Sequence, residues 1–458
     1  MKPGGTIEKR SVLLVITIAS FFNPFLGSSI NIALPSIGRE FGMTAISLGW
    51  VTTAFLLASA MSQVPFGRLA DIKGRKKVFL SGALLHALSS IIAAISISPA
   101  MLISSRVLQG IASAMAFGTG VAILMSLFSP EERGKVLGIN VTAVYAGLST
   151  GPFLGGLLTQ YLGWRSIFFI TSPLWLIILA MGYWKLKSER ADAEGEKFDF
   201  TGSVIYGLTL SAIIYGLSEL PSYWGTSSLL AGFLGIWTFV KYEMKTVSPV
   251  FDIHLFKNNR VFALSNLAAL IHYSSGSAVV FLLSLYLQYI KGLSPEKAGL
   301  ILLSQPVLQA AFSSYAGRLS DRIEPRIVAS IGMGVTVAGL FLLIFLTPET
   351  RVEFIIGSLV LLGFGFALFS SPNTNAVMSS VEKKFYGVAS GTVGTMRTTG
   401  MMFSMGMVML IFSVMMGPVQ ITPEYYPSFL KCVKITFLIS AFLCSAGVFA
   451  SLARGKLR

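Results

Sequence analysis

Long apolar runs, separated by short polar stretches, recur along this chain almost from end to end. Each run is long enough to cross a hydrocarbon core of about 30 Å as an α-helix. The first run has no signal-peptide pattern and leads directly into the second. The pattern predicts an all-α polytopic membrane protein with fourteen spans, at residues 12–33, 47–66, 79–97, 100–127, 136–158, 166–184, 203–218, 227–242, 261–290, 298–316, 327–346, 354–378, 386–416 and 430–452.

The polar stretches group these spans as six, two and six. A charged linker at residues 185–200 follows the sixth span, and a juxtamembrane stretch precedes the ninth. We therefore predict an N-terminal six-helix bundle at 1–184, a middle segment at 185–260 that contains the linker and two extra helices, and a C-terminal six-helix bundle at 261–458. Within the middle segment, residues 250–256 are apolar on one side and are expected to lie along the membrane surface.

Composition agrees with this interpretation. The chain is 53% hydrophobic and 12% charged, whereas soluble domains carry about 25% charged residues. The net charge of +15 does not indicate nucleic-acid binding, because the basic residues lie at the ends of the predicted spans. Most of them fall in loops on the side of the termini, which places both termini in the cytoplasm and the protein in the plasma membrane.

The chain shows no cofactor or metal motif. Cys432 and Cys444 lack metal-ligand spacing and are expected to be packing residues. The sequence has no nucleotide-binding P-loop, and no acidic residue inside a span for a membrane enzyme to use. We expect neither a cofactor, nor a metal site, nor an enzymatic activity.

Two related charged cassettes follow the second and tenth predicted spans. The first cassette, residues 67–77, reads Gly-Arg-Leu-Ala-Asp-Ile-Lys-Gly-Arg-Lys-Lys, and the second, residues 317–322, reads Gly-Arg-Leu-Ser-Asp-Arg. A repeated loop of this kind indicates two related halves, which is the usual architecture of alternating-access transporters.

The first cassette resembles the loop signature of the major facilitator superfamily. Residues 102–110, with Arg106 and Gln109, resemble the family's helix 4 motif, and residues 147–156 resemble its helix 5 antiporter motif. With fourteen spans, the chain is most similar to the drug:proton antiporter branch. The resemblance implies the family's fold, with two six-helix bundles plus two inserted helices.

The resemblance also assigns roles to residues. It implies that the first cassette, just past the end of helix 2, is a conformational latch which holds the cytoplasmic helix ends together. The second cassette lacks the glycine region and is expected to be a weaker latch. The latch residues are Gly67, Asp71, Gly74, Arg75 and Asp321. The helix 5 motif implies a kinked packing seam between the two halves, made of Gly147, Gly151, Pro152, Gly155 and Gly156.

Two residues inside spans are candidates for proton coupling. A buried arginine is costly in a bilayer, so Arg106 is functional by default; the alternative is that it reaches the outer membrane surface. His272 titrates near neutrality, although it and His86 could each be ordinary packing residues.

The chain departs from the drug:proton branch at one functional position. That branch carries an aspartate in helix 1, where this chain has Leu26, and no Asp or Glu lies inside any predicted span. We therefore expect a neutral, amphiphilic or anionic substrate. Arg397 either faces the cavity or only anchors its helix. Polar residues in the spans give the cavity candidates Asn31, Gln109, Tyr145, Gln305, Gln309, Asn373 and Arg397.

The predicted function is secondary transport by alternating access, as a proton-coupled exporter of small amphiphilic compounds of the multidrug efflux type. The alternatives are a uniporter or metabolite exporter without proton coupling, and a receptor or scaffold that does not transport. The expected partners are a small-molecule substrate, protons and membrane lipids. No nucleic-acid partner is expected, and the protein is expected to be a monomer.

Overall fold

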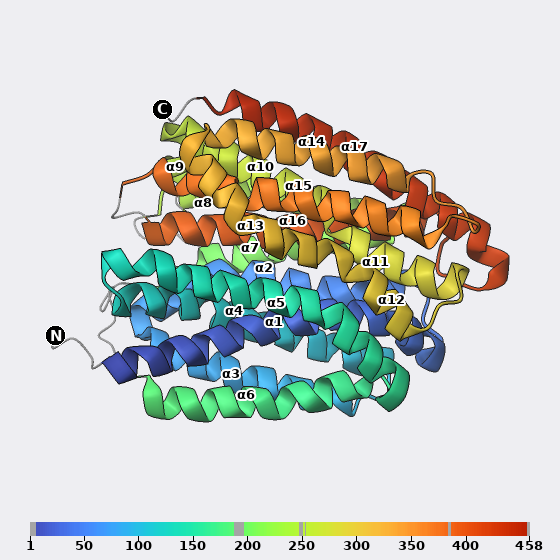
Figure 1. Ribbon diagram of the computed structural model, residues 1–458, viewed down its shortest axis with the longest axis horizontal. Coiled ribbons are helices and arrows are strands. Elements are labelled where there is room, and N and C mark those ends of the chain that lie inside the picture. Colours follow the sequence, from blue (N-terminus) through green and yellow to red (C-terminus); the bar gives the residue numbers. More distant parts are fainter. Residues whose placement is uncertain (1–5, 187–196, 247–250, 252, 383–385, 456–458) are drawn as a thin grey trace.

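The computed structural model describes residues 6–186, 197–246, 251, 253–382 and 386–455. Regular structure in these residues is entirely helical, and the predicted all-α fold is confirmed (Figure 1). A helix, or a run of short consecutive helices, occupies each of the fourteen predicted segments. Residues 187–196 of the predicted linker, and Val250 and Asp252 of the predicted surface segment, lie outside the described residues.

The helices fall into three groups along the chain. The first half contains α1 (Thr6–Phe41), α2 (Ala45–Lys73), α3 (Arg75–Ala94), α4 (Pro99–Leu127), α5 (Pro130–Leu162) and α6 (Arg165–Lys185). The middle group contains α7 (Phe200–Glu219), α8 (Tyr223–Glu243) and the short α9 (Ile253–Asn258). The second half contains α10 (Arg260–Gly276), α11 (Ala278–Leu285), the π-helix η1 (Tyr286–Ile290), α12 (Pro295–Leu302), α13 (Ser304–Arg322), α14 (Pro325–Leu343), α15 (Val352–Ser379), α16 (Tyr386–Met415), the 3₁₀ turn η3 (Pro423–Tyr425) and α17 (Tyr426–Ala453).

Twelve helical segments of the described residues are long and apolar enough to cross a membrane. Two of the fourteen predicted spans, 227–242 and 298–316, are not among them. The first corresponds to α8, whose two ends are polar. The second is divided into α12 and α13 at Leu303, so neither piece alone combines the length and the apolar character of a span.

Local sequence explains where several helices begin and end. Thr44 and Ser98 cap α2 and α4 by accepting hydrogen bonds from Ser47 N and Met101 N. Ser129 forms a capping box with Glu132, which starts α5 six residues before the predicted span. Helix α2 runs on to Gly74, so the prediction that Asp71 follows the end of helix 2 is wrong.

A proline breaks one of the predicted spans, 298–316, into two helices. The break at Leu303 lies close to Pro306, whose ring nitrogen cannot donate to the carbonyl of Leu302. Pro24 and Pro372, by contrast, lie inside the continuous helices α1 and α15.

The helices of each half pack mainly with one another. In the first half, α1 packs against α4, α5 and α6, and α2 packs against α4; in the second, α10 packs against α16 and α17, and α13 and α14 pack against α15. Helices α7 and α8 pack together, and α7 contacts both α2 and α16. Both chain termini lie at the same end of the bundle (Figure 1). We call it the terminal end and the opposite end the far end.

Candidate functional site

A cavity of about 270 Å³ lies between the two halves. Helices α1, α2, α4 and α5 supply one wall, and α10, α11, α13, α15 and α16 supply the other. Four of the predicted cavity residues, Asn31, Gln305, Gln309 and Arg397, line it. The other three, Gln109, Tyr145 and Asn373, do not, because each is held in a hydrogen-bonded cluster behind the wall.

The cavity wall is apolar with a few amides and two cations. Its large side chains are Phe55, Phe117, Tyr273, Phe281 and Phe366, with Met401 and Met405 beside them. Its amides are Asn23, Asn31, Gln63, Gln305 and Gln309. Among the described residues that line it there is no Asp, Glu, Lys or His. The fixed charge of the wall is therefore positive.

Arg106 is held rigidly at the edge of this cavity. Its side chain is 1% exposed, its Nε donates to the carbonyl of Val51 at 3.2 Å, and its Nη1 donates to Gln109 Oε1. Gln109 Nε2 in turn donates to Ser90 Oγ at 3.1 Å. These contacts tie α4 to α2 and α3. The alternative in which Arg106 extends to the outer membrane surface is wrong, because Val51 of α2 and Gln109 of α4 provide buried acceptors for it.

Arg397 is held much less tightly than Arg106. It is half-buried on α16, and its guanidinium lies 5.4 Å from the centre of the Tyr273 ring. The described residues give it neither a hydrogen bond nor an ion pair. The Tyr273 hydroxyl is hydrogen-bonded to Ser370 Oγ at 3.2 Å, and Ser370 Oγ is hydrogen-bonded to the Tyr145 hydroxyl at 3.3 Å. This hydroxyl cluster joins α5 to the second half behind the cavity wall.

Asn373 belongs to a second polar cluster, which sequence reasoning missed. Arg454 Nη1 donates to Asn373 Oδ1 at 2.8 Å and to Ser265 Oγ at 3.1 Å, and Asn373 Nδ2 donates to the carbonyl of Ser265 at 3.1 Å. Arg454 is 1% exposed, and burial lowers its pKa to about 10, so that it stays charged at neutral pH. In the sequence it reads as one more basic residue near the C-terminus.

The two histidines that lie within spans are packed against aromatic rings. His86 stacks on Trp175 at 4.1 Å between ring centroids, and His272 stacks on Phe369 at 4.0 Å. His272 Nδ1 lies 4.0 Å from Cys444 Sγ, and its ring is outside the cavity lining although its neighbour Tyr273 is part of it. This geometry is that of packing residues.

At the far end, side chains of the second half reach backbone carbonyls of α1. Pro35 lacks an N–H, so the carbonyl of Asn31, four residues earlier, loses its partner within the helix. Ser284 Oγ donates to this carbonyl at 2.6 Å. Gln288 Nε2 donates to the carbonyl of Ile32 at 2.9 Å. In the sequence, the signal for this contact is Pro35, which lies two residues past the first predicted span.

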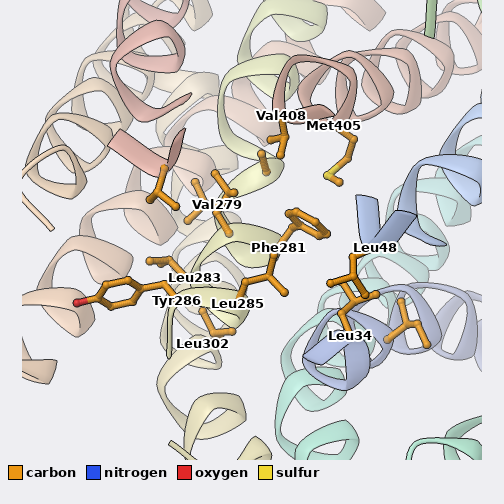
Figure 2. Close-up of a cluster of buried hydrophobic side chains, with 14 of the residues drawn as sticks. Leu34, Leu48, Val279, Phe281, Leu283, Leu285, Tyr286, Leu302, Met405 and Val408 are labelled. Atoms are coloured by element: carbon orange, nitrogen blue, oxygen red, sulfur yellow. The ribbon is translucent and has the colours of Figure 1, made fainter. Parts of the chain in front are cut away.

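An apolar cluster closes the same end. Figure 2 shows Phe281 of α11 between Leu48 of α2 and Met405 of α16, with Leu34 of α1 next to Leu48. All four belong to one buried cluster that extends through both halves. Among the bonds between described residues, those that join the two halves lie at this end or at mid-depth. They include Tyr161 hydroxyl to Glu296 Oε2 at 3.1 Å and Ala45 N to the carbonyl of Val419 at 2.9 Å.

The two cassettes, at the terminal end, bond within their own halves. Asp71 Oδ1 accepts from Arg75 Nη2 at 2.9 Å and from its Nε at 3.2 Å. Gly74 between them has φ +101°, a left-handed conformation that favours glycine. Asp321 Oδ1 accepts from Asn375 Nδ2 of α15 at 3.2 Å. The open space around Gly67 shows that close packing does not require its small size in this arrangement.

The glycines of the helix 5 motif are a packing seam, but mostly not between the halves. A Cβ at Gly147, Gly151 or Gly155 would lie 2.7 Å or less from atoms of α1, in the same half. Only Gly156 touches the second half, where a Cβ would lie 2.5 Å from the carbonyl oxygen of Pro295. On the other side, a Cβ at Gly299 would lie 2.2 Å from the carbonyl oxygen of Pro152. The expectation of a seam between the halves therefore holds for one of the four glycines.

Comparisons with known proteins show which family and which relatives this chain is similar to. The family model described as Major Facilitator Superfamily matches residues 16–405 and 265–454. The chain is 27% identical to the riboflavin transporter RibZ of Clostridioides difficile, covering 96% of each chain. It is 30% identical to the multidrug resistance protein Stp of Mycobacterium tuberculosis, covering 84% of this chain and 73% of the relative.

Two further similarities agree with these. The chain is 29% identical to the cephamycin export protein CmcT of Amycolatopsis lactamdurans, covering 98% of this chain and 94% of the relative. A crystal structure of the nucleoside transporter NupG superposes with a TM-score of 0.67 at 15% identity, covering 97% of this chain and 99% of NupG. That likeness concerns the fold.

Proposed function

This chain belongs to the Major Facilitator Superfamily, and we propose that it exports small amphiphilic molecules by alternating access, in exchange for protons. The observation that carries the proposal is the cavity between the halves, which is sealed at the far end by bonds across the interface. Such a cavity must open at one end at a time, and the bonds at the far end define which end is closed here.

The distribution of basic residues supports a cytoplasmic location for both termini. The far end is then extracellular, and the structure corresponds to an inward-facing arrangement in the plasma membrane. In this proposal the bundles 1–184 and 261–458 rock as two bodies, while α7 and α8 of the segment 185–260 bridge α2 and α16.

The first cassette is proposed to act in the opposite arrangement. In the inward-facing structure Asp71 accepts hydrogen bonds from Arg75 of its own cassette. When the cytoplasmic side closes, Asp71 would exchange this contact for one with the second half. The second cassette, where Asp321 is bonded to α15, is proposed to contribute less.

The cavity chemistry supports a neutral or anionic substrate. The wall has two arginines and no acidic side chain among its described residues, so a lipophilic cation would find no counter-charge there. Two of the relatives are named as a riboflavin transporter and a cephamycin export protein.

Arg106 is our candidate for proton coupling. It lines the cavity, and it is the cavity residue that links three helices of the first half. His272 is the second candidate, but its packing against Phe369 gives it no direct route to the cavity. If transport proves independent of a pH gradient, the protein is instead a uniporter or metabolite exporter without proton coupling.

Flux in proteoliposomes tests the proposal. Purified protein would be screened for export of neutral and anionic amphiphiles and one lipophilic cation, with and without a pH gradient, and with Asp71→Asn as the impaired control. We expect gradient-dependent flux of neutral or anionic compounds. Robust export of the cation would contradict the substrate class, and substrate binding without flux would favour a receptor or scaffold.

A further inference from the structure

The two guanidinium groups of the cavity differ in how much of their hydrogen-bonding capacity the protein already uses. Arg106 is buried, donates to the Val51 carbonyl and to Gln109, and lies over the Phe55 ring at 4.5 Å. Two of its N–H donors and one of its faces are therefore occupied. Arg106 is thus anchored in the wall.

Arg397 contrasts with it in each respect. It is half-buried, lines the cavity, and has no hydrogen bond or ion pair with the described residues. Its guanidinium lies 5.4 Å from the centre of the Tyr273 ring, and the Tyr273 hydroxyl is hydrogen-bonded to Ser370. A guanidinium offers five N–H donors in a fixed planar fork that matches a carboxylate. These donors are available to a ligand.

An amide acceptor lies in the same wall. Gln305 is 7% exposed, and its Oε1 is buried without a hydrogen-bond partner among the described residues. A buried acceptor left unpaired is destabilising, so a ligand that brings an N–H or O–H to it removes that cost. The neighbouring wall is aromatic, through Phe366 and Phe281.

We propose that Arg397 binds the negatively charged group of an aromatic substrate and that Gln305 accepts a hydrogen bond from an N–H or O–H donor on the same molecule. The inference rests on the proposed transport function and names its substrate class: small aromatic monoanions, such as hydroxyaryl carboxylates. The cavity volume of about 270 Å³ lies near the lower end of ligand pockets, about 300–1,000 Å³, and suits one or two rings.

Three probes separate the two contacts. Salicylate carries both the anion and the hydroxyl donor, benzoate carries the anion alone, and salicylamide carries the donor without the full charge. Equilibrium binding to purified protein in detergent, and flux in proteoliposomes, would be measured for the wild type, Arg397→Gln, Arg397→Lys and Gln305→Met. Arg351→Gln, which removes a charge from an exposed site outside the cavity, is the matched control.

We expect Arg397→Gln to weaken salicylate and benzoate binding about tenfold or more, as for loss of a charge-assisted hydrogen bond. Arg397→Lys retains the charge but loses the planar fork, so it should weaken binding of both anions, but less than Arg397→Gln does. Binding of salicylamide should be affected little by either variant. Gln305→Met should weaken the binding of salicylate about fivefold and leave the binding of benzoate nearly unchanged.

Two results would overturn the inference. One is an equal loss of affinity for salicylate and for salicylamide in Arg397→Gln, which would mean that Arg397 has a structural role. The other is wild-type protein that exports a neutral amphiphile but does not bind salicylate, which would leave the proposed function intact. Salicylate binding without flux of any compound would contradict the transport proposal alone.

Discussion

The two ends of the interface between the halves are held by different kinds of contact. At the far end, uncharged side chains of α11 and η1 donate to backbone carbonyls of α1, and an apolar cluster fills the space around them. At the terminal end, the charged cassettes bond within their own halves. A carbonyl acceptor keeps a fixed position on its helix, whereas a surface charge can exchange partners at small cost. The far end is therefore built to stay closed in this arrangement and the terminal end to change.

The sharpest way to break the far end is to separate α5 from α12. Gly299→Ala would place a Cβ 2.2 Å from the carbonyl oxygen of Pro152, and backbone cannot yield without moving one helix. Overpacking of this kind costs about 1–3 kcal/mol. We expect the closed far end to lose population about tenfold or more, measured as labelling of a cysteine introduced in the cavity by an impermeant thiol reagent added outside.

Gly334→Ala is the matched control, because nothing lies within 4 Å of a Cβ there. It should leave labelling unchanged. If Gly299→Ala labels no faster than this control, close packing of α5 and α12 does not hold the far end shut.

A second prediction isolates the Asn31 carbonyl. Ser284→Ala leaves this buried acceptor without its donor, at a cost of about 1–2 kcal/mol, so labelling from outside should rise about five- to thirtyfold. Pro35→Ala restores an N–H that can bond to the Asn31 carbonyl within α1. Ser284→Ala should therefore raise labelling less in the Pro35→Ala background than in the wild type. Additive effects of the two substitutions in the labelling assay would contradict the assigned role of Pro35.

A third prediction concerns the terminal end. Asp71→Asn removes a half-buried ion pair with Arg75, worth no more than about 1 kcal/mol, so labelling through the far end should hardly change. Transport should nevertheless fall about fivefold or more, if Asp71 contributes about 1 kcal/mol to closing the cytoplasmic side. Asp321→Asn should reduce flux by less than Asp71→Asn. Equal loss of flux in the two variants would show that the cassettes are equivalent.

The smallest effect is expected at Glu132, also at the terminal end. A hydrogen bond from Lys9 at 2.9 Å, aided by Ser129 N, lowers the pKa of its carboxyl below 4.5. A lowered carboxyl pKa stabilises the folded state above the unfolded pKa, and this stabilisation is lost as pH falls through the folded pKa. The difference in melting temperature between wild type and Glu132→Gln should be small at pH 7 and shrink as the pH falls below 4.5. A difference in melting temperature that grows on acidification would contradict a lowered pKa at Glu132.

Much of the fold could be predicted from the sequence, and less of the site. Span positions follow from apolar length, and Gly74 marked a turn correctly. The start of α5 and the end of α2 did not follow from apolar length. The cap at Ser129 and the extension of α2 past Asp71 to Lys73 lie in polar stretches beyond the hydrocarbon core. Four of the seven cavity candidates line the cavity; Gln109, Tyr145 and Asn373 are instead bonded to Arg106, Ser370 and Arg454.

The sequence by itself determined that the chain crosses the membrane repeatedly, that its two halves are related, and that no acidic residue lies within a predicted span. Only the tertiary structure decided which polar residues face the cavity. It also decided that Arg106 is hydrogen-bonded within the protein while the donors of Arg397 are available to a ligand, and that Ser284 donates to the Asn31 carbonyl that Pro35 leaves without a partner. The reason is that lipid and protein interior are equally apolar, so hydropathy fixes the length of a span but not its rotation. Rotation is set by contacts between helices far apart in the chain.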